Sequence, residues 1–239
     1  MLRNLTENKF KILSGSMLKM LAIICMVIDH SAAILYPVID AMRFPFSIGG
    51  KVITLYWIMR KIGRLAFPIF CFLIAEGFHH TRSKKKYAIR LLIFAFISEV
   101  PFDLMRRGSF FDLSGQNVYF TLLLGLALIY AYESINGQFK TFCVMALIAA
   151  TATLLRTDYG LAGVILVFVI YLFRTQPAVQ ALLSYPLLSG GIAAFAAFLP
   201  INLYNDQRGF IKSPLLKYAF CIFYPVHILI LLGIRYLLK

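Results

Sequence analysis

The chain has 239 residues, of which 61% are hydrophobic and 14% are charged, and its mean hydropathy is +0.81. These values exclude an ordinary soluble domain and predict a polytopic membrane protein. The net charge of +14 does not predict nucleic-acid binding, because the basic residues lie between apolar runs, where lipid headgroups and the preference of Lys and Arg for cytoplasmic loops account for them.

Eight apolar runs are candidates for membrane-spanning helices, which need about 20 mostly apolar residues each. We therefore predict an all-α fold of about eight transmembrane helices in a single bundle, residues 17–239, after a cytoplasmic N-terminal segment, residues 1–16. Two prolines and two glycines follow the first run and predict a loop, then an interfacial or re-entrant segment, over residues 37–57. The predicted spans are 17–36, 58–78, 87–105, 118–132, 139–155, 159–173, 179–201 and 215–237.

An even number of spans puts both ends of the chain on one side of the membrane. The densest basic cluster, residues 82–86, is a short connector of the kind that counts most in setting orientation. Placing this cluster in the cytoplasm predicts that the N-terminus and the C-terminus are both cytoplasmic.

The first run carries Asp29 and His30 side by side, well inside it. An acidic side chain at the bilayer centre costs about 2.5–3.5 kcal/mol on insertion scales, and intramembrane ionisable residues are functional candidates. Because neighbouring helix positions point about 100° apart, each of the two residues needs a partner on another helix. Two interpretations stay open: a buried structural ion pair, or a base or proton relay that faces a cavity.

The second run opens with three cations, Arg60, Lys61 and Arg64. Arg binds phosphate oxygens bidentately, so Arg64, the deepest of the three, is the candidate functional cation. Arg60 and Lys61 are predicted to extend to lipid headgroups. Glu76 and His79 have the spacing of a di-iron motif, but such a site needs two copies and the chain has one, so we predict no metal site.

The third run contains Glu99 and Asp103 one helical turn apart, with Pro101 between them. Two carboxylates on one helix face repel each other unless a cation or a shared proton intervenes. Two interpretations stay open: Arg106 and Arg107 neutralise the acids, or the acids act in catalysis.

Polar residues also open or interrupt the later runs. Gln116 and Asn117 precede the fourth run, where they favour helix capping and hydrogen bonding into the same cavity. Asp158 precedes the sixth run as a predicted N-cap. The last run contains His227 beside a proline, and a second intramembrane histidine predicts that His30 and His227 share a site.

Several common catalytic motifs are missing from the sequence. The chain has no phosphate-binding loop of ATPases, no Gly-x-Gly-x-x-Gly dinucleotide motif, no His-Glu-x-x-His and no Gly-x-Ser-x-Gly. Their absence argues against an ATP-driven pump, a nicotinamide enzyme, a zinc protease or a serine hydrolase.

A set of short motifs follows a fixed order from residue 18 to the end of the chain. They are Leu18-Lys19 leading to Met26-Val27-Ile28-Asp29-His30, Gly63-Arg64-Leu65-Ala66-Phe67-Pro68-Ile69-Phe70, Glu76-Gly77, Glu99-Val100-Pro101-Phe102-Asp103, Gln116-Asn117-Val118, Thr157-Asp158-Tyr159-Gly160 and Phe223-Tyr224-Pro225-Val226-His227. Together these motifs resemble the TraX family. Its members are associated with N-terminal acetylation of conjugative pilin, and the family is similar to a wider group of integral-membrane acyltransferases that use acetyl-CoA.

The resemblance implies an acyltransferase of the bacterial cytoplasmic membrane that transfers acetyl from acetyl-CoA to an amine or hydroxyl. In the wider group a histidine of the first spanning helices is catalytic, and His30 is the matching position. We predict His30 as the base, helped by Asp29, Glu99, Asp103 and His227. The predicted acetyl-CoA-binding residues are Arg64, Arg82, Lys84, Lys85 and Lys86, and the predicted cavity residues are Glu76, Gln116, Asn117 and Tyr224.

Two other functions stay open. A proton-coupled transporter would use the same acids and histidines as a relay, although the sequence has no inverted repeat. A non-enzymatic assembly factor for a pilus or secretion apparatus is the third function. The predicted partners are the lipid bilayer and an acyl acceptor, either a protein N-terminus or a small molecule, and nucleic acid is not among them.

Overall fold

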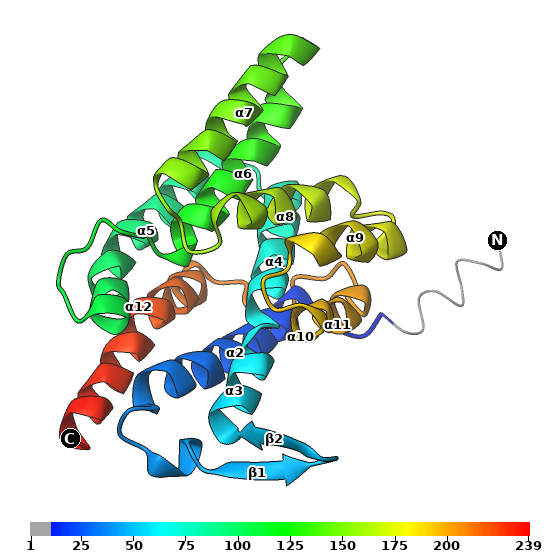
Figure 1. Ribbon diagram of the computed structural model, residues 1–239. Helices are drawn as coiled ribbons and strands as arrows, with labels where there is room; N and C mark the ends of the chain where they lie inside the picture. The colour runs from blue at the N-terminus through cyan, green and yellow to red at the C-terminus, as the bar shows by residue number, and fades with distance from the viewer. Residues whose placement is uncertain (1–10) are drawn as a thin grey trace. The chain divides into compact units, whose positions relative to one another are not determined.

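The computed structural model describes residues 11–239, and the described chain is helical apart from one β-hairpin and its connecting loops (Figure 1). The predicted all-α class is confirmed. The chain forms two compact parts. We call residues 1–69 with 192–239 the N/C part and residues 70–191 the middle part. Of the predicted N-terminal segment, residues 1–16, the first ten residues lie outside the described part of the chain. The single bundle stays a prediction.

The N/C part is built around α2 (Gly15–Leu35), which packs against α3 (Leu55–Gly63) and α12 (Pro214–Leu237). Ser14 caps α2 by accepting a hydrogen bond from the backbone N–H of Met17 at 3.3 Å. The smaller elements of this part are η2 (Asp40–Met42), β1 (Pro45–Ile48), β2 (Lys51–Thr54), α10 (Ile192–Phe195) and α11 (Phe198–Asn202).

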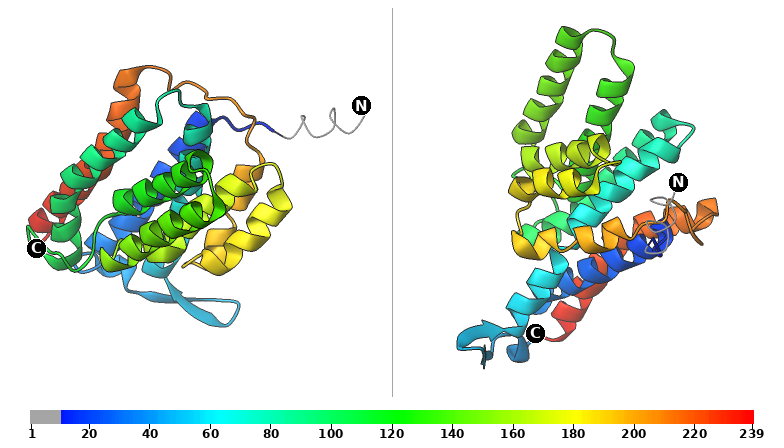
Figure 2. Two further views of the ribbon diagram at one scale, coloured as in Figure 1. Left: turned by 90° about the horizontal axis from the view of Figure 1, so that it is seen from above. Right: turned by 90° about the vertical axis from the view of Figure 1, so that its right-hand side faces the viewer.

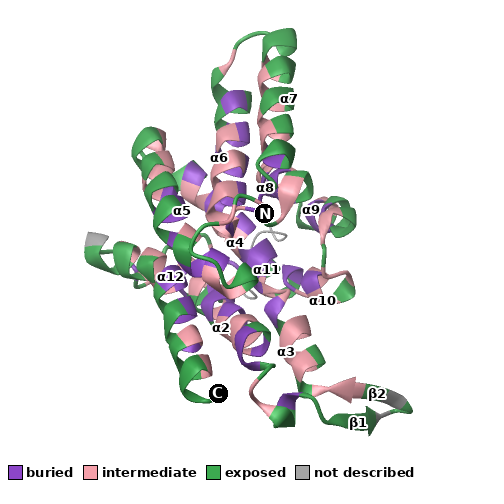
Figure 3. Ribbon diagram, turned by 60° about the vertical axis from the view of Figure 1, so that its left-hand side comes forward, coloured by how far each residue is buried: buried purple, intermediate pink, exposed green. Residues whose placement is uncertain are grey.

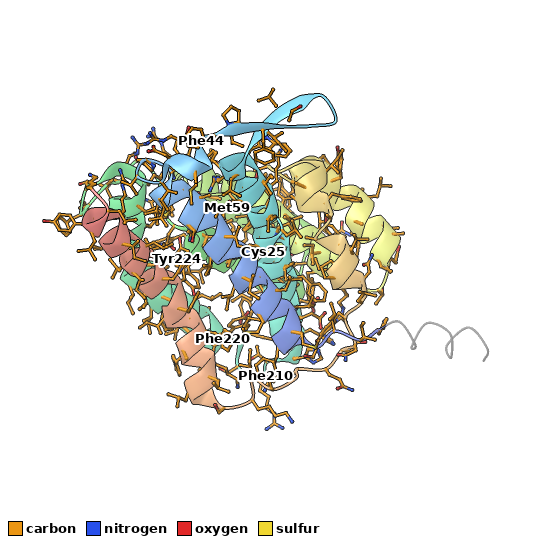
Figure 4. All side chains as sticks on the ribbon, turned by 90° about the horizontal axis from the view of Figure 1, so that it is seen from below. Cys25, Phe44, Met59, Phe210, Phe220 and Tyr224 are labelled. Atoms are coloured by element: carbon orange, nitrogen blue, oxygen red, sulfur yellow. The ribbon has the colours of Figure 1, made fainter. Side chains whose placement is uncertain are left out.

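Helices α2 and α12 run in the same direction (Figure 4). At the start of α2 the Ser16 N–H donates to the Arg208 carbonyl, just before α12, at 2.9 Å. Farther along both helices the Lys19 ammonium lies 5.7 Å from the centre of the Phe220 ring, and farther again His30 meets α12. Eight alternating spans would require antiparallel first and last helices, so this direction disagrees with the predicted placement of both termini on one side.

Only α2 and residues 215–237 of α12, among the described helices, are long and apolar enough to cross a bilayer by length and composition. The count of eight spans therefore stays a prediction. Two of the predicted runs are not single helices. Residues 58–78 divide into α3 and α4 (Ala66–His80), and residues 179–201 divide into short pieces.

Prolines account for both divisions. Pro68 has no N–H to donate to the Arg64 carbonyl, so it is tolerated in the first turn of α4 but cannot continue α3. Pro186 similarly follows the end of α9 (Pro177–Ser184) within η3 (Tyr185–Leu187). Gly191, at φ +58°, then separates η3 from α10.

The predicted loop at residues 37–57 contains a two-stranded antiparallel hairpin, which the sequence analysis missed. Gly49 and Gly50 both have positive φ, +56° and +76°, as the tightest hairpin turns require. Phe46 pairs with Ile53 across the strands. The Gly-Gly pair between two short runs of apolar residues was the available signal.

In the middle part, α6 (Val118–Ser134) packs against α5 (Lys84–Arg107), α7 (Gln138–Leu154) and α8 (Gly160–Leu172) (Figure 2). Gly125 permits the close approach of α8, because a Cβ atom there would lie 2.7 Å from the Cβ of Val167. Most of α7 is exposed (Figure 3), and its exposed residues include Phe139, Phe142 and Leu147. Such an apolar surface suits hydrocarbon rather than water.

The direction of α12 generates the first prediction. We expect Ile12→Cys and Tyr236→Cys, each in a background that lacks the four native cysteines, to react with a membrane-impermeant maleimide from opposite faces. Ile12 and Tyr236 are 62% and 79% exposed; Ile12 precedes α2, and Tyr236 lies in the last turn of α12, at the opposite end of the parallel pair. Labelling in right-side-out and inverted vesicles is the measurement. Labelling of both positions from the same face would contradict two parallel spans.

Candidate functional site

His30 of α2 and His227 of α12 form a hydrogen-bonded pair inside the N/C part. The Nδ1 atom of His30 lies 2.7 Å from the Nε2 atom of His227. The two ring planes differ by 11° and the ring centres are 4.9 Å apart, as an in-plane N–H···N bond requires. The structure thus places in contact the two histidines that the sequence analysis put in one site.

A backbone carbonyl fixes the direction of this hydrogen bond. The Nδ1 atom of His227 lies 2.8 Å from the Phe223 carbonyl oxygen, and a carbonyl only accepts, so this nitrogen carries the proton. A neutral His227 then accepts at Nε2, and His30 donates from Nδ1. The lone pair of a neutral His30 is left on Nε2, which makes no hydrogen bond within the described chain.

Tyr224 lies one helical turn before His227 and borders both rings. Its ring centre is 5.9 Å from that of His30 and 5.9 Å from that of His227. Tyr224 and His227 are each 5% exposed. The aromatic ring of Tyr224, from α12, therefore packs against both histidines (Figure 4 labels Tyr224).

Asp29 faces α3 rather than α12 and pairs with Arg60. The guanidinium Nη1 atom of Arg60 lies 2.6 Å from Asp29 Oδ2, and both side chains are mostly buried. The prediction that Arg60 extends to lipid headgroups is wrong, because an unpaired carboxylate in apolar surroundings costs more than a headgroup contact gains. Arg64, the predicted functional cation, is the C-cap residue of α3.

Gly63 lets α3 approach Asp29 closely. A Cβ atom at Gly63 would lie 2.3 Å from the Asp29 Cβ and 2.2 Å from Asp29 Oδ1, so no larger residue fits without displacing one helix. Asp29 Oδ1 is buried and has no hydrogen-bond partner among the described residues. The close approach, rather than a second donor, holds this oxygen in place.

Glu99 and Asn117 form a partly buried, hydrogen-bonded contact between α5 and α6. The carboxylate of Glu99 accepts from the Asn117 backbone N–H at 3.0 Å and from its side-chain amide at 3.2 Å. The same amide donates to the Ala95 carbonyl at 2.7 Å, while the Asn117 Oδ1 atom caps α6 by accepting from the Tyr119 N–H. Asn117 is therefore the N-cap that its position predicted, and it also ties α6 to α5.

Asp103 accepts a hydrogen bond from the backbone N–H of Asp112 at 2.9 Å. Glu99 and Asp103 are thus each held by a backbone N–H of a different segment. Neutralisation of these acids by Arg106 and Arg107, one of the two open interpretations, is not what the structure shows. Arg107 lies 3.5 Å from Asp112, and Arg106 lies 4.0 Å from Asp158.

Two details of the surrounding loops differ from expectation. The N-cap of α8 is Tyr159, not Asp158. Gln116, a predicted cavity residue, binds through its backbone: its N–H donates to the Arg156 carbonyl at 3.2 Å and its carbonyl accepts from the Asp158 N–H.

In the exposed loop between α5 and α6, hydrogen bonds from Ser114 lower the pKa of Asp112 below its ordinary value.

The predicted acetyl-CoA-binding cations of residues 82–86 lie at the junction of α4 and α5. Lys84 turns back to the Phe78 and Thr81 carbonyls at the end of α4. Arg82, Lys85 and Lys86 are exposed. Glu76, a predicted cavity residue, lies 3.2 Å from His80 on the same helix. Their roles in binding stay predictions.

The sequence profile of the TraX protein family matches residues 14–235. The chain belongs to the TraX family. It is 30% identical to the "Probable fimbrial assembly protein FimC, serogroup H1" of Dichelobacter nodosus, over 95% of this chain and 97% of that protein. It is also 30% identical to the "Uncharacterized protein RP591" of Rickettsia prowazekii (strain Madrid E), over 54% of this chain and 43% of that protein. No solved structure matches the chain.

The family and the apolar helices identify this TraX chain as a membrane protein. The motifs that resemble the TraX family divide between the two parts. Residues 26–30, 63–70 and 223–227 supply the histidine pair, Asp29 and Gly63 of the N/C part. Residues 99–103, 116–118 and 157–160 supply the hydrogen-bonded helix junctions of the middle part. Arg60 lies outside these motifs. The sequence did not identify it as the partner of Asp29, because an arginine at that position suits a lipid headgroup as well as a buried acid.

The contact between Gly63 and Asp29 generates the second prediction. We expect Gly63→Ala to lower the free energy of unfolding by about 1–3 kcal/mol, as overpacking in well-packed interiors does. The matched control is Gly233→Ala in α12, where an added Cβ meets nothing within 4 Å and helix propensity favours Ala by about 1 kcal/mol. Thermal unfolding in detergent measures both. Equal midpoints for the two variants would contradict the close packing of α3 on α2.

Proposed function

We propose that the protein is a membrane acyltransferase that moves an acetyl group from acetyl-CoA to an amine or hydroxyl. The observation that carries the proposal is the chain of hydrogen bonds from His30 through His227 to the Phe223 carbonyl. This chain leaves the lone pair of His30 on Nε2, where a general base needs it.

The reaction begins when an acceptor amine attacks the thioester carbonyl carbon. A C–N bond forms, His30 Nε2 takes the proton that the amine loses, and the C–S bond breaks. The thiolate of CoA leaves and receives that proton from His30, so atoms and charges balance. While His30 is protonated, its Nδ1–H bond to His227 becomes charge-assisted and stronger. His227 is therefore a positioning residue that also stabilises the developing imidazolium.

The relatives and the family resemblance suggest which acceptor to test first. One relative carries the name of a fimbrial assembly protein, and the TraX resemblance implies acetylation of pilin. We therefore propose the amine of a pilus or fimbrial subunit as the first acceptor to test, followed by small envelope molecules. The bacterial cytoplasmic membrane as location belongs to the same proposal.

A second function, assembly without catalysis, is favoured by the name of that fimbrial relative. A proton-coupled transporter is the third. Proteoliposomes separate the three, because the acyltransferase releases CoA from acetyl-CoA, the transporter moves a solute or protons, and the assembly factor does neither.

The third prediction tests the base. We expect His30→Asn to lower acetyl transfer about 10²–10⁴-fold, the usual contribution of a general base. Asn keeps an N–H near the Nδ1 position but has no basic nitrogen. His80→Asn is the matched control, since His80 pairs with Glu76 on α4. Transfer of labelled acetyl by purified protein is the measurement, and full activity in His30→Asn would refute the mechanism.

The fourth prediction concerns His227. We expect His227→Ala to lower kcat about 10–100-fold, the value of one hydrogen bond to a charged group. His227→Gln, which restores an acceptor oxygen near the Nε2 position, is expected to recover part of this loss. The pH profile of kcat should shift in the alanine variant, because His30 loses the partner that stabilises its protonated form. An unshifted profile would assign His227 a packing role only.

A further inference from the structure

A cleft of about 450 Å³ lies in the loop before α12, lined by Gln207, Arg208, Gly209, Phe210 and Lys212. We propose that this cleft binds the phosphorylated adenine nucleotide of the acyl donor. The inference rests on the proposed acyltransferase function. It places the nucleotide site at the start of α2 and α12, and assigns it to cations other than Arg64 and those of residues 82–86.

The cleft carries two cations that other groups do not neutralise. Arg208 and Lys212 are exposed, and within the described residues neither forms an ion pair. The neighbouring acid, Asp206, lies 3.9 Å from the Lys11 ammonium instead. An Arg guanidinium and a Lys ammonium on one short loop match the diphosphate and the 3′-phosphate of CoA.

The loop is held in place before any ligand arrives. The Gly15 N–H donates to the Gln207 carbonyl at 2.8 Å, and the Ser16 hydroxyl donates to the Arg208 carbonyl at 2.7 Å. The same hydroxyl oxygen accepts from the Ile211 N–H at 2.9 Å. These bonds use the first amides of α2, so the side chains of Arg208 and Lys212, not the helix end, are the groups left to bind an anion.

Gly209 makes this close packing possible. Its φ is +78°, and a Cβ atom there would lie 2.4 Å from the Ser14 hydroxyl oxygen. Next to it, Phe210 is 57% exposed (Figure 4). An exposed aromatic ring beside two cations is a platform on which a base stacks while its phosphates are held.

The distance from the cleft to the histidine pair is consistent with CoA. His30 is 15 residues from the first residue of α2, and His227 is 13 residues from the first residue of α12. At 1.5 Å per residue these separations are about 22 Å and 20 Å. The extended phosphopantetheine arm covers a distance of this order, so a nucleotide in the cleft can present its thioester to His30.

The inference also implies a side of the membrane for the start of α2 and α12. Lys11, Lys19, Arg208, Lys212 and Lys217 all lie at the start of the two parallel helices. Basic residues that flank spans gather on the cytoplasmic side. CoA thioesters are cytoplasmic metabolites, so the inference requires this end of the helices to face the cytoplasm, although Arg43 and Arg235 lie at the other end.

The fifth prediction measures binding of labelled CoA to the full-length protein in zwitterionic nanodiscs. We expect the double variant Arg208→Gln/Lys212→Gln to raise the Kd for CoA at least tenfold. The matched control, Lys140→Gln/Arg174→Gln, removes one Lys and one Arg from exposed positions of the middle part and should bind as the wild type does. His30→Asn should also keep the wild-type Kd, since its defect lies in the chemical step.

The outcomes separate this inference from the proposed function. Acetyl transfer by the wild type with an unchanged Kd in Arg208→Gln/Lys212→Gln overturns the inference alone. Loss of CoA binding in that variant, in a protein that transfers no acetyl, supports the cleft and overturns the acyltransferase. If phosphatidylglycerol in the nanodiscs abolishes CoA binding and zwitterionic discs show no Arg208-dependent binding, the cleft holds lipid headgroups and the inference is wrong.

Discussion

The free-energy cost of placing ionisable groups in apolar surroundings determines which polar contacts α2 makes in the N/C part. Asp29 and His30 are neighbours on α2, so their side chains leave the helix in different directions and no single partner satisfies both. Arg60 from α3 meets the acid, and His227 from α12 meets the imidazole. Helix α2 is therefore bound on two sides by polar contacts, and the absence of a side chain at Gly63 lets one of those neighbours come close enough.

The sequence predicted the positions of α2, α5, α6, α7, α8 and α12 to within a few residues, because each is an apolar run bounded by polar or breaking residues. It also predicted that His30 and His227 share a site, since His227 is the one histidine of the last run and lies near its middle. It did not predict the direction of α12, because hydropathy carries no information on direction. The partner of Arg60 depended on packing between α2 and α3, which no local pattern encodes.

The middle part uses its polar residues in a different manner. Asn117 caps α6, and its amide and backbone N–H bind α5 through Ala95 and Glu99. The segment from Gln116 is bonded in turn to the residues before α8. Carboxylates and amides that resemble a catalytic set in the sequence thus join the interior of α5 to the start of α6, and the segment before α6 to the segment before α8. This arrangement explains why motif residues occur in a part of the chain that does not contain the histidine pair.

The carbonyl of Phe223 has a further consequence for how such a site exists within lipid. In a serine protease triad the group that orients the histidine is a carboxylate, so the resting site carries a formal charge. Here a backbone oxygen terminates the relay, and two neutral rings carry none. The first and last helices can then enter hydrocarbon without an ion at this position, and under the proposed mechanism charge arises only while His30 holds the proton of the acceptor.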